Sequence, residues 1–231
     1  MRITLVALAA SLVALPLHQQ GEELRDLPLT EFRPVPGEDS TTLALVMTGD
    51  GGWASLPTHL SRYLAAHGIG VAGINMRSYL LLKSRTPDAV ASDMSRVLAH
   101  YLAAWHRERV IIVGYSRGAD VAPFVVSRLP ADLRRRVTLV AMLGIARNAS
   151  FEFHLGDLIH DVERPTDLPT APELERLRGT RMLCVYGTEE KNSACRGADS
   201  TLITRIERVG GHQINGDFDA IGAAILRAMP R

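Results

Sequence analysis

The stretch Arg109-Val110-Ile111-Ile112-Val113-Gly114-Tyr115-Ser116-Arg117-Gly118 decides the expected fold. Its first half holds four consecutive β-prone apolar residues with no helical period, which predicts a short buried strand. The pattern G-x-S-x-G follows at once. A serine held in a very tight strand-to-helix turn needs such glycines, because neighbouring backbone must pass without a Cβ in the way. The stretch therefore predicts a nucleophilic Ser116 exposed above a sheet.

The residues after the pentapeptide support this interpretation. From Ala119 to Leu129, apolar side chains recur at helical intervals, and Pro123 falls within the first two turns of that segment. Strand, turn and helix thus follow one another in the order that the motif requires. The pentapeptide alone also fits a glycine-rich turn with a surface serine, so the function depends on the partners that the chain supplies.

The composition is that of an ordinary globular protein. The chain has 231 residues, of which 46% are hydrophobic and 22% charged, enough for one large α/β domain. A net charge of +1 gives no support for nucleic-acid binding. The arginine run over residues 134–136 fits a solvated helix end.

The amino terminus has the features of an export signal. Met1-Arg2 is a short positive start, and residues 3–17 are almost wholly apolar but too few to span a membrane. This pattern predicts a signal peptide over residues 1–20, with no clear cleavage site, and a mature domain over residues 21–231. A buried first element of the domain is the alternative.

Strand-like and helix-like segments alternate along the mature chain. Expected strands cover residues 27–32, 41–47, 69–75, 110–113, 136–143, 181–186 and 202–209, and expected helices cover residues 55–67, 87–107, 119–129, 171–177 and 218–229. This order predicts βαβ units in one domain, with a mostly parallel central sheet and helices on both faces. Residues 76–86 are expected to form a loop, and residues 144–170 a small cap.

A nucleophilic serine needs a base and an acid that orients the base. In this architecture both follow the serine, the acid first and the histidine last. Of eight histidines, His212 follows the last expected strand and two glycines, which makes it the expected base, while His154 and His160 fall in the cap. A surface loop histidine is the alternative for His212.

The acid is expected in the loop after the strand over residues 181–186. Glu190 is the first choice and Glu189 the second, and both also fit solvated loop charges. The chain has two cysteines, Cys184 and Cys195, and an exported protein with one pair usually joins it. This disulfide would hold the segment that carries the acid. Two free thiols are the alternative.

The oxyanion donors are expected to be backbone N–H groups, one from Arg117 and one from Asp50 or Gly51 in the glycine-rich loop after an early strand. No phosphate-loop pattern, H-E-x-x-H motif or cysteine and histidine ligand set occurs in the sequence, so neither a cofactor nor a metal is expected.

Basic residues near the expected site favour an anionic substrate. Arg77, Lys83 and Arg85 lie on the expected loop at the carboxyl ends of the strands, where ligands bind in such sheets, and Arg117 is next to the nucleophile. Pairing of these side chains with local carboxylates is the alternative.

Four segments together resemble the VirJ/AcvB family of bacterial virulence proteins. They are residues 48–53 (TGDGGW), residues 114–120 (GYSRGAD) with Pro123-Phe124, the glutamate loop between the cysteines, and residues 210–212 (GGH) with Gly216-Asp217. The resemblance implies an α/β-hydrolase fold, a periplasmic location, a triad of Ser116, Glu190 and His212, and a link to type IV secretion and virulence. The family also includes hydrolases of lysyl-phosphatidylglycerol. Residues 79–82 (YLLL) and Gln213 depart from the family pattern, and both departures bear on the substrate.

The sequence thus predicts a periplasmic serine hydrolase that cleaves an ester, with aminoacyl-phosphatidylglycerol as leading substrate. The expected partners are a lipid or small-molecule ester, the membrane surface and secretion-system proteins, but no nucleic acid. Two alternatives remain open: a hydrolase-fold binding protein that assists secretion without turnover, and a thioesterase or acyltransferase.

Overall fold

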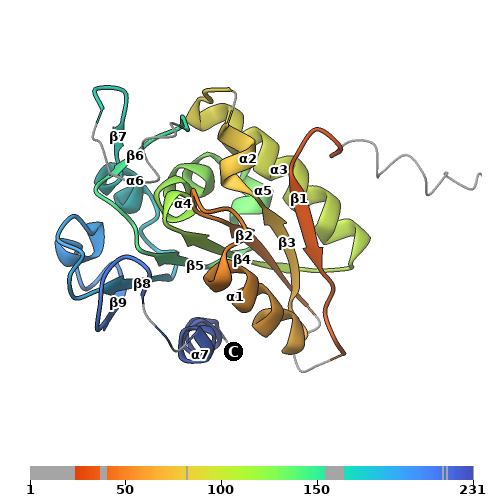
Figure 1. Cartoon of the computed structure of the whole chain (residues 1–231). Coiled ribbons are helices and arrows are strands. Elements are labelled where there is room, and N and C mark those ends of the chain that lie inside the picture. Colours follow the sequence, from red (N-terminus) through yellow and green to blue (C-terminus); the bar gives the residue numbers. More distant parts are fainter. Residues whose placement is uncertain are drawn as a thin grey trace, which may run out of the picture.

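The computed structural model describes residues 24–36, 41–81, 83–153, 164–214, 216 and 218–230, so the predicted signal peptide lies outside it. Within these residues a sheet of seven strands has the order β1-β3-β2-β4-β5-β8-β9 (Figure 1). The edge strand β1 is antiparallel to β3, and all other neighbours are parallel. The strands are β1 (Leu29–Phe32), β2 (Thr42–Met47), β3 (Gly70–Ile74), β4 (Arg109–Tyr115), β5 (Val137–Leu143), β8 (Met182–Gly187) and β9 (Thr204–Arg208). The predicted mostly parallel sheet is confirmed.

Helices cover both faces of the sheet (Figure 1). Each buried strand contributes side chains to the hydrophobic clusters on both faces of the sheet, because successive side chains point to opposite faces. In β2, Leu43, Leu45 and Met47 belong to one hydrophobic cluster, and Ala44 and Val46 to the other. The first cluster is covered by α3 (Pro87–Ala104), α4 (Arg117–Arg128), α5 (Ala131–Arg134) and α6 (Ala171–Arg176), and the second by α1 (Ser55–Ala66) and α7 (Phe218–Ala228).

One expected loop is partly helical. Residues 76–86 begin with the short helix α2 (Met76–Leu80), so the prediction of a loop was wrong for its first five residues. Asn75 caps this helix, since its side chain accepts a hydrogen bond from the N–H of Ser78 at 3.2 Å. Met76, Tyr79 and Leu80 are buried at helical spacing, but one turn is too short to give a periodic signal.

The region predicted to form a cap contains a small hairpin. Strand β6 (Asn148–Ala149) pairs antiparallel with β7 (Leu168–Pro169). Residues 154–163, with both cap histidines, lie outside the described residues. The hairpin follows β5 and therefore stands at the same sheet edge as Ser116.

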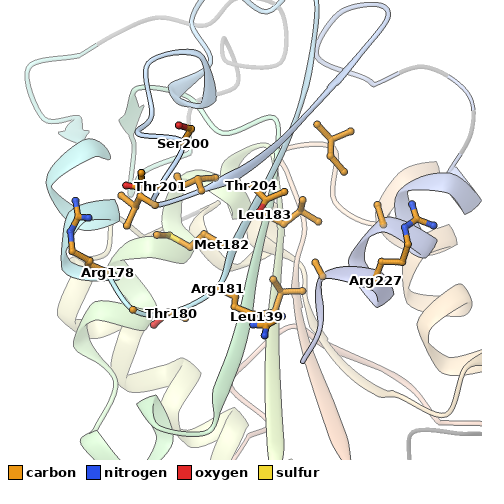
Figure 2. Close-up of a pocket in the computed structure, with 16 residues that line it drawn as sticks. Leu139, Arg178, Thr180, Arg181, Met182, Leu183, Ser200, Thr201, Thr204 and Arg227 are labelled. Atoms are coloured by element: carbon orange, nitrogen blue, oxygen red, sulfur yellow. The ribbon is translucent and has the colours of Figure 1, made fainter. Parts of the chain in front are cut away.

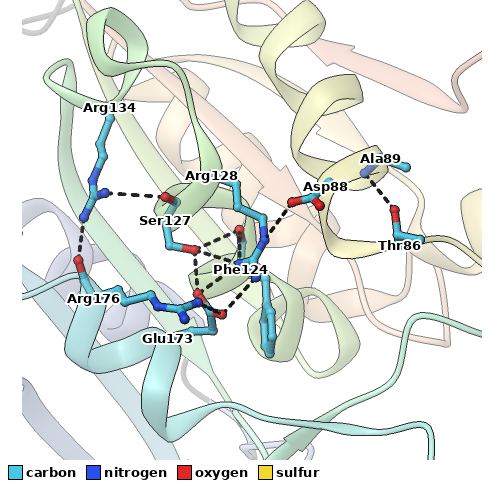
Figure 3. Close-up of polar contacts among 9 residues, drawn as sticks. All are labelled: Thr86, Asp88, Ala89, Phe124, Ser127, Arg128, Arg134, Glu173 and Arg176. Atoms are coloured by element: carbon cyan, nitrogen blue, oxygen red, sulfur yellow. Dashed lines mark hydrogen bonds and ion pairs between the residues drawn. The ribbon is translucent and has the colours of Figure 1, made fainter.

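An ion-pair network around the buried Glu173 joins α6, which follows the cap region, to the helix after Ser116 (Figure 3). Glu173 on α6 accepts a hydrogen bond from Ser127 Oγ at 2.6 Å and pairs with Arg128 at 3.0 Å, and both partners lie on α4. Burial opposes ionisation of Glu173, but the hydrogen bonds from Arg128 and Ser127 outweigh it and lower the pKa of this carboxyl. The network fixes α6 against α4.

No helix among the described residues is long and apolar enough to cross a bilayer.

Candidate active site

Ser116 stands in a strained turn between β4 and α4. Its φ is +53°, a left-handed conformation that costs a non-glycine residue about 1–3 kcal/mol. The N–H of Ser116 donates to the carbonyl of Leu143 on β5 at 2.9 Å, which helps to hold the turn. The side chain is thereby placed at the carboxyl edge of the sheet, as the G-x-S-x-G motif predicts.

Both glycines of the motif are required because a side chain at either position would clash with neighbouring backbone, and neither has a positive φ. A Cβ on Gly114 would lie 2.4 Å from the carbonyl oxygen of Gly118, and a Cβ on Gly118 would lie 2.1 Å from that of Met47. Backbone atoms cannot move aside as a flexible side chain can. The spacing in the sequence therefore reflects how closely β4, α4 and the end of β2 pass one another.

Ser116, His212 and Glu190 form one chain of polar contacts. Nε2 of His212 lies 2.8 Å from Oγ of Ser116, and Nδ1 lies 2.5 Å from Oε1 of Glu190. The other carboxylate oxygen of Glu190 accepts a hydrogen bond from the N–H of Gly187 at 2.6 Å. The residues come from three loops, after β4, β8 and β9, which the parallel sheet brings to one edge. The arrangement can carry a proton away from the serine hydroxyl.

The structure distinguishes between the two glutamates considered for the acid. Glu189 is exposed, and its side chain makes no hydrogen bond or ion pair with the described residues, whereas Glu190 contacts the imidazole. The Glu190 side chain is only 9% exposed. Glu190 is therefore the glutamate in position to orient His212.

The loop that carries Glu190 is anchored on both sides. The expected disulfide joins Cys184 in β8 to Cys195, which lies in the 3-10 turn η2 (Ala194–Arg196). The side chain of Arg196 donates to the carbonyl of Glu190 at 2.9 Å and to that of Gly187 at 3.3 Å. These bonds restrict the loop and with it the position of the carboxylate.

Gly144 is a site residue that the sequence analysis missed. It follows β5 directly and has a φ of +68°. A Cβ at this position would lie 2.9 Å from Cε1 of His212 and 3.3 Å from Oε1 of Glu190. The Tyr115 ring also stacks on the imidazole, with centroids 5.8 Å apart. The imidazole thus contacts an aromatic ring and lies close to a position that has room only for glycine.

The loop Gly49-Asp50-Gly51-Gly52 follows β2 and lies next to Ser116. A Cβ on Gly49 would lie 2.8 Å from Cβ of Ser116, so this position has no room for a side chain beside the serine. The N–H of Gly52 donates to the carbonyl of Gly49 at 2.9 Å, which closes the turn. The N–H groups of Asp50 and Gly51 have no acceptor among the described residues, as donors for an oxyanion require.

Two charged side chains near Ser116 lie inside the protein rather than in solvent. Arg117 pairs with Asp50 at 2.9 Å, so its guanidinium is not open to an anionic substrate, contrary to the expectation for this residue. Asp120 is almost fully buried, and one of its oxygens accepts a hydrogen bond from the N–H of Ala146 at 2.7 Å. Burial raises the pKa of Asp120 to about 7, although that hydrogen bond and the charge of Arg117 oppose the shift. The burial of Asp120 and its hydrogen bond from Ala146 were not predicted, although Asp120 belongs to the GYSRGAD segment.

The three other basic residues have different surroundings. Arg85 pairs with Asp93 at 3.3 Å and stacks on the Tyr79 ring at 4.4 Å, which is the alternative considered for it. Arg77 is exposed on α2 with its guanidinium 5.8 Å from the Phe153 ring centroid, and Lys83 is exposed after α2. Arg77 and Lys83 have no carboxylate partner among the described residues.

Two cavities lie outside this constellation. One, of about 660 Å³, is lined by the amino-terminal parts of β5, β8 and β9 and by α7 (Figure 2), whereas Ser116 lies beyond the carboxyl end of its strand. The other, of about 870 Å³, lies between the hairpin β6–β7, α6 and η2. Neither lining includes Ser116, Glu190 or His212.

The described residues contain no group of three or more histidine, cysteine, aspartate or glutamate side chains that could hold a metal ion.

Solved structures similar to this chain include esterases and related hydrolases. Est1E from Butyrivibrio proteoclasticus has a TM-score of 0.62 at 12% identity, over 86% of this chain and 91% of that chain. LpqC, a poly(3-hydroxybutyrate) depolymerase from Bordetella parapertussis, has a TM-score of 0.56 at 16% identity, over 88% and 85%. The esterase domain of a Rhodothermus marinus protein has a TM-score of 0.57 at 14% identity, over 85% and 91%. At such identities the similarity establishes the α/β-hydrolase fold.

Among curated proteins, none matches the sequence significantly. The family model for the bacterial virulence protein VirJ matches residues 41–231, which include the complete serine, glutamate and histidine constellation. The match covers most of the chain and agrees with the resemblance seen in the motifs. The chain is therefore a member of the VirJ family of bacterial virulence proteins.

Proposed function

We propose that the protein is a periplasmic serine hydrolase that cleaves a carboxylic ester. The observation that carries this proposal is the line of contacts from Ser116 Oγ through the His212 ring to Glu190, with distances of 2.8 and 2.5 Å. The similarity of the fold to solved esterase structures and the membership of the VirJ family support this proposal.

In the proposed mechanism, Oγ of Ser116 attacks the ester carbonyl while Nε2 of His212 takes the hydroxyl proton. Glu190 keeps the imidazole oriented and stabilises its positive charge. The N–H groups of Arg117 and of Asp50 or Gly51 bind the oxyanion of the tetrahedral intermediate. His212 then gives the proton to the leaving alcohol. Water enters, loses a proton to His212 and releases the acyl group from Ser116 by the same steps.

The leading substrate is aminoacyl-phosphatidylglycerol, above all its lysyl form. Family resemblance motivates this choice, and two side chains fit it. Arg77 and Lys83 are cations without a carboxylate partner among the described residues, on the segment after β3. A phosphodiester is an anion that such side chains bind. In this proposal the lysyl group is transferred to Ser116 and phosphatidylglycerol leaves as the alcohol.

The cellular setting belongs to the same proposal. Residues 1–20 have the features of a signal peptide, and a lipid substrate would bring the mature protein to the periplasmic membrane surface. The description of the VirJ family supports a link to virulence. A link to type IV secretion, with secretion-system proteins as partners, is proposed from the resemblance alone.

The test uses the purified mature protein and its Ser116→Ala variant. Each is incubated with lysyl-phosphatidylglycerol in detergent micelles and with p-nitrophenyl butyrate, and released lysine and nitrophenol are measured. The proposal predicts lysine release that is lost in the variant, because removal of the nucleophile of such a triad typically lowers kcat by about 10⁶-fold.

Other outcomes would change the proposal in defined ways. Ester cleavage without lysine release would retain the serine hydrolase and exclude the lipid substrate. No turnover of either compound by folded protein would favour the binding role without catalysis. Transfer of the acyl group to an added thiol or amine in preference to water would indicate an acyltransferase.

A further inference from the structure

The side chain of Arg117 connects the two segments expected to supply the oxyanion donors. Its Nε lies 3.1 Å from Oδ1 of Asp50, and its Nη2 lies 2.9 Å from Oδ2, so the pair is bidentate. The two side chains are only 9% and 17% exposed. The guanidinium also donates through Nη1 to the carbonyl of Ser150, at 3.3 Å, next to the hairpin β6–β7. Arg117 thus contacts the loop after β2 and the start of the cap from the first residue of α4.

Other hydrogen bonds hold the ends of the loop that receives this contact. Thr48 Oγ1 donates to the carbonyl of Gly49 at 3.2 Å, and the N–H of Ala54 donates to that of Gly52 at 2.8 Å. Asp50 is the one residue with a side chain in the segment Gly49-Asp50-Gly51-Gly52. Within the segment, the N–H of Gly52 bonds to the carbonyl of Gly49, but Asp50 and Gly51 donate to no described residue. Glycine-rich backbone has large conformational freedom, which must be restricted if an N–H group is to point at one place. The two hydrogen bonds from Arg117 to the Asp50 carboxylate supply that restriction.

We propose that the Arg117–Asp50 ion pair sets the geometry of the oxyanion hole, which makes both side chains positioning residues. This inference rests on the proposed function. The pair joins the residue after the nucleophile to the opposite donor loop, so the two N–H groups keep a constant separation. The guanidinium also balances the Asp50 carboxylate, which would otherwise place a negative charge near the developing oxyanion.

The geometry argues against the other role for Arg117, that of a receptor for a substrate anion. Both the Nε and the Nη2 groups face Asp50, and the side chain is 91% covered. A substrate phosphate would have to displace a bidentate carboxylate. The two roles predict different kinetics, because a receptor affects KM on anionic substrates whereas a positioning residue affects kcat on all substrates.

The test compares four variants, Arg117→Met, Arg117→Lys, Asp50→Asn and the double variant Arg117→Met/Asp50→Asn, on p-nitrophenyl butyrate, which is neutral. We expect Arg117→Met to lower kcat by about 10- to 100-fold with little change in KM, since displacement of a catalytic group by 1 Å can cost about 100-fold. The double variant should regain part of this loss, because it removes the unbalanced carboxylate. Arg117→Lys, which keeps the charge but not the bidentate contact, should fall between wild type and Arg117→Met.

A boronic acid inhibitor provides a second measurement. It forms a tetrahedral adduct with the serine, so its inhibition constant should rise in parallel with the loss of kcat. Arg96→Met is the matched control, because Arg96 on α3 also makes a bidentate pair, at 3.0 and 2.9 Å to Asp26, but its side chain is 39% exposed. It should leave kcat and inhibition unchanged.

The possible failures are distinguishable. Wild-type kcat in Arg117→Met would overturn this inference alone, as would a change confined to KM on lysyl-phosphatidylglycerol. Loss of kcat with no recovery in the double variant, and with a proportional loss of folded protein by circular dichroism, would assign the pair a structural role and overturn it too. A wild-type protein with no Ser116-dependent turnover would overturn the proposed function, and this inference with it.

Discussion

The position of Gly144 allows a sharp test of how closely the imidazole is confined. At a φ of +68°, an alanine Cβ would lie 2.9 Å from Cε1 of His212, where an ordinary contact needs at least 3.4 Å. The ring must therefore move by about 0.5 Å or more, and a 1 Å error in a catalytic group can cost about 100-fold in rate. We expect Gly144→Ala to lower kcat/KM of ester hydrolysis by about 10-fold or more.

The same substitution also strains the backbone. A left-handed conformation costs an L-residue about 1–2 kcal/mol, which for a chain of this size lowers Tm by about 2–8 °C. The matched control is Gly179→Ala, because Gly179 has a φ of +93° but no atom within 4 Å of the added Cβ. Gly179→Ala should lower Tm by a similar amount and leave kcat/KM unchanged.

The assay is hydrolysis of p-nitrophenyl butyrate at saturating and limiting concentrations, with Tm measured by circular dichroism on the same samples. Wild-type kcat/KM in Gly144→Ala, with the Tm loss of the control, would refute the reasoning. It would mean that the imidazole tolerates displacement and that its observed position does not limit catalysis.

Three further predictions concern stability. Burial raises the pKa of Asp120 to about 7 in the folded protein, whereas the unfolded chain loses this proton near pH 4. The free energy of unfolding should therefore fall as pH rises from about 4 to 7. Asp120→Asn should raise Tm, measured by calorimetry, at pH 8 but not at pH 4. The pKa of the Glu173 carboxyl is lowered in the folded protein, so the ionised carboxylate stabilises the fold, and this stabilisation is lost as pH falls through the lowered pKa. Glu173→Gln should therefore lower Tm at pH 7 by more than at pH 3, without changing kcat. Replacement of both Cys184 and Cys195 by alanine opens a crosslink with a sequence separation of 11 and should destabilise by about 3 kcal/mol, with a lower kcat because the Glu190 loop loosens.

Much of the fold followed from short-range patterns. The apolar run before Gly114 forms β4, and the helix expected from residue 87 begins there as α3. Thr86 caps this helix by accepting a hydrogen bond from the N–H of Ala89 at 3.2 Å. Such signals reside in neighbouring residues, so the sequence displays them directly. Helix α2 was missed because a single turn has no repeat to detect, and the antiparallel pairing of β6 with β7 depends on contacts across the cap.

The site was predictable where chain order carries the information. The order of strands placed Ser116, the glutamate loop and His212 at one sheet edge, and the structure brings their side chains into contact. Position in the loop favoured Glu190 over Glu189 but left both open, and the structure places Glu190 against the imidazole. Which of two adjacent side chains turns inward depends on tertiary contacts that the sequence does not display. The role of Gly144 and the pairing of Arg117 with Asp50 are contacts between distant segments, and no local pattern marks them.

The central claim is that Ser116 is a nucleophile activated by His212. The most direct measurement is covalent labelling of folded protein with a fluorophosphonate, followed by intact mass and peptide mapping. The account predicts one adduct per molecule on Ser116, none in Ser116→Ala, and much slower labelling in His212→Ala. Folded wild-type protein that acquires no adduct, or acquires it on another residue while Ser116 stays unmodified, would contradict the account.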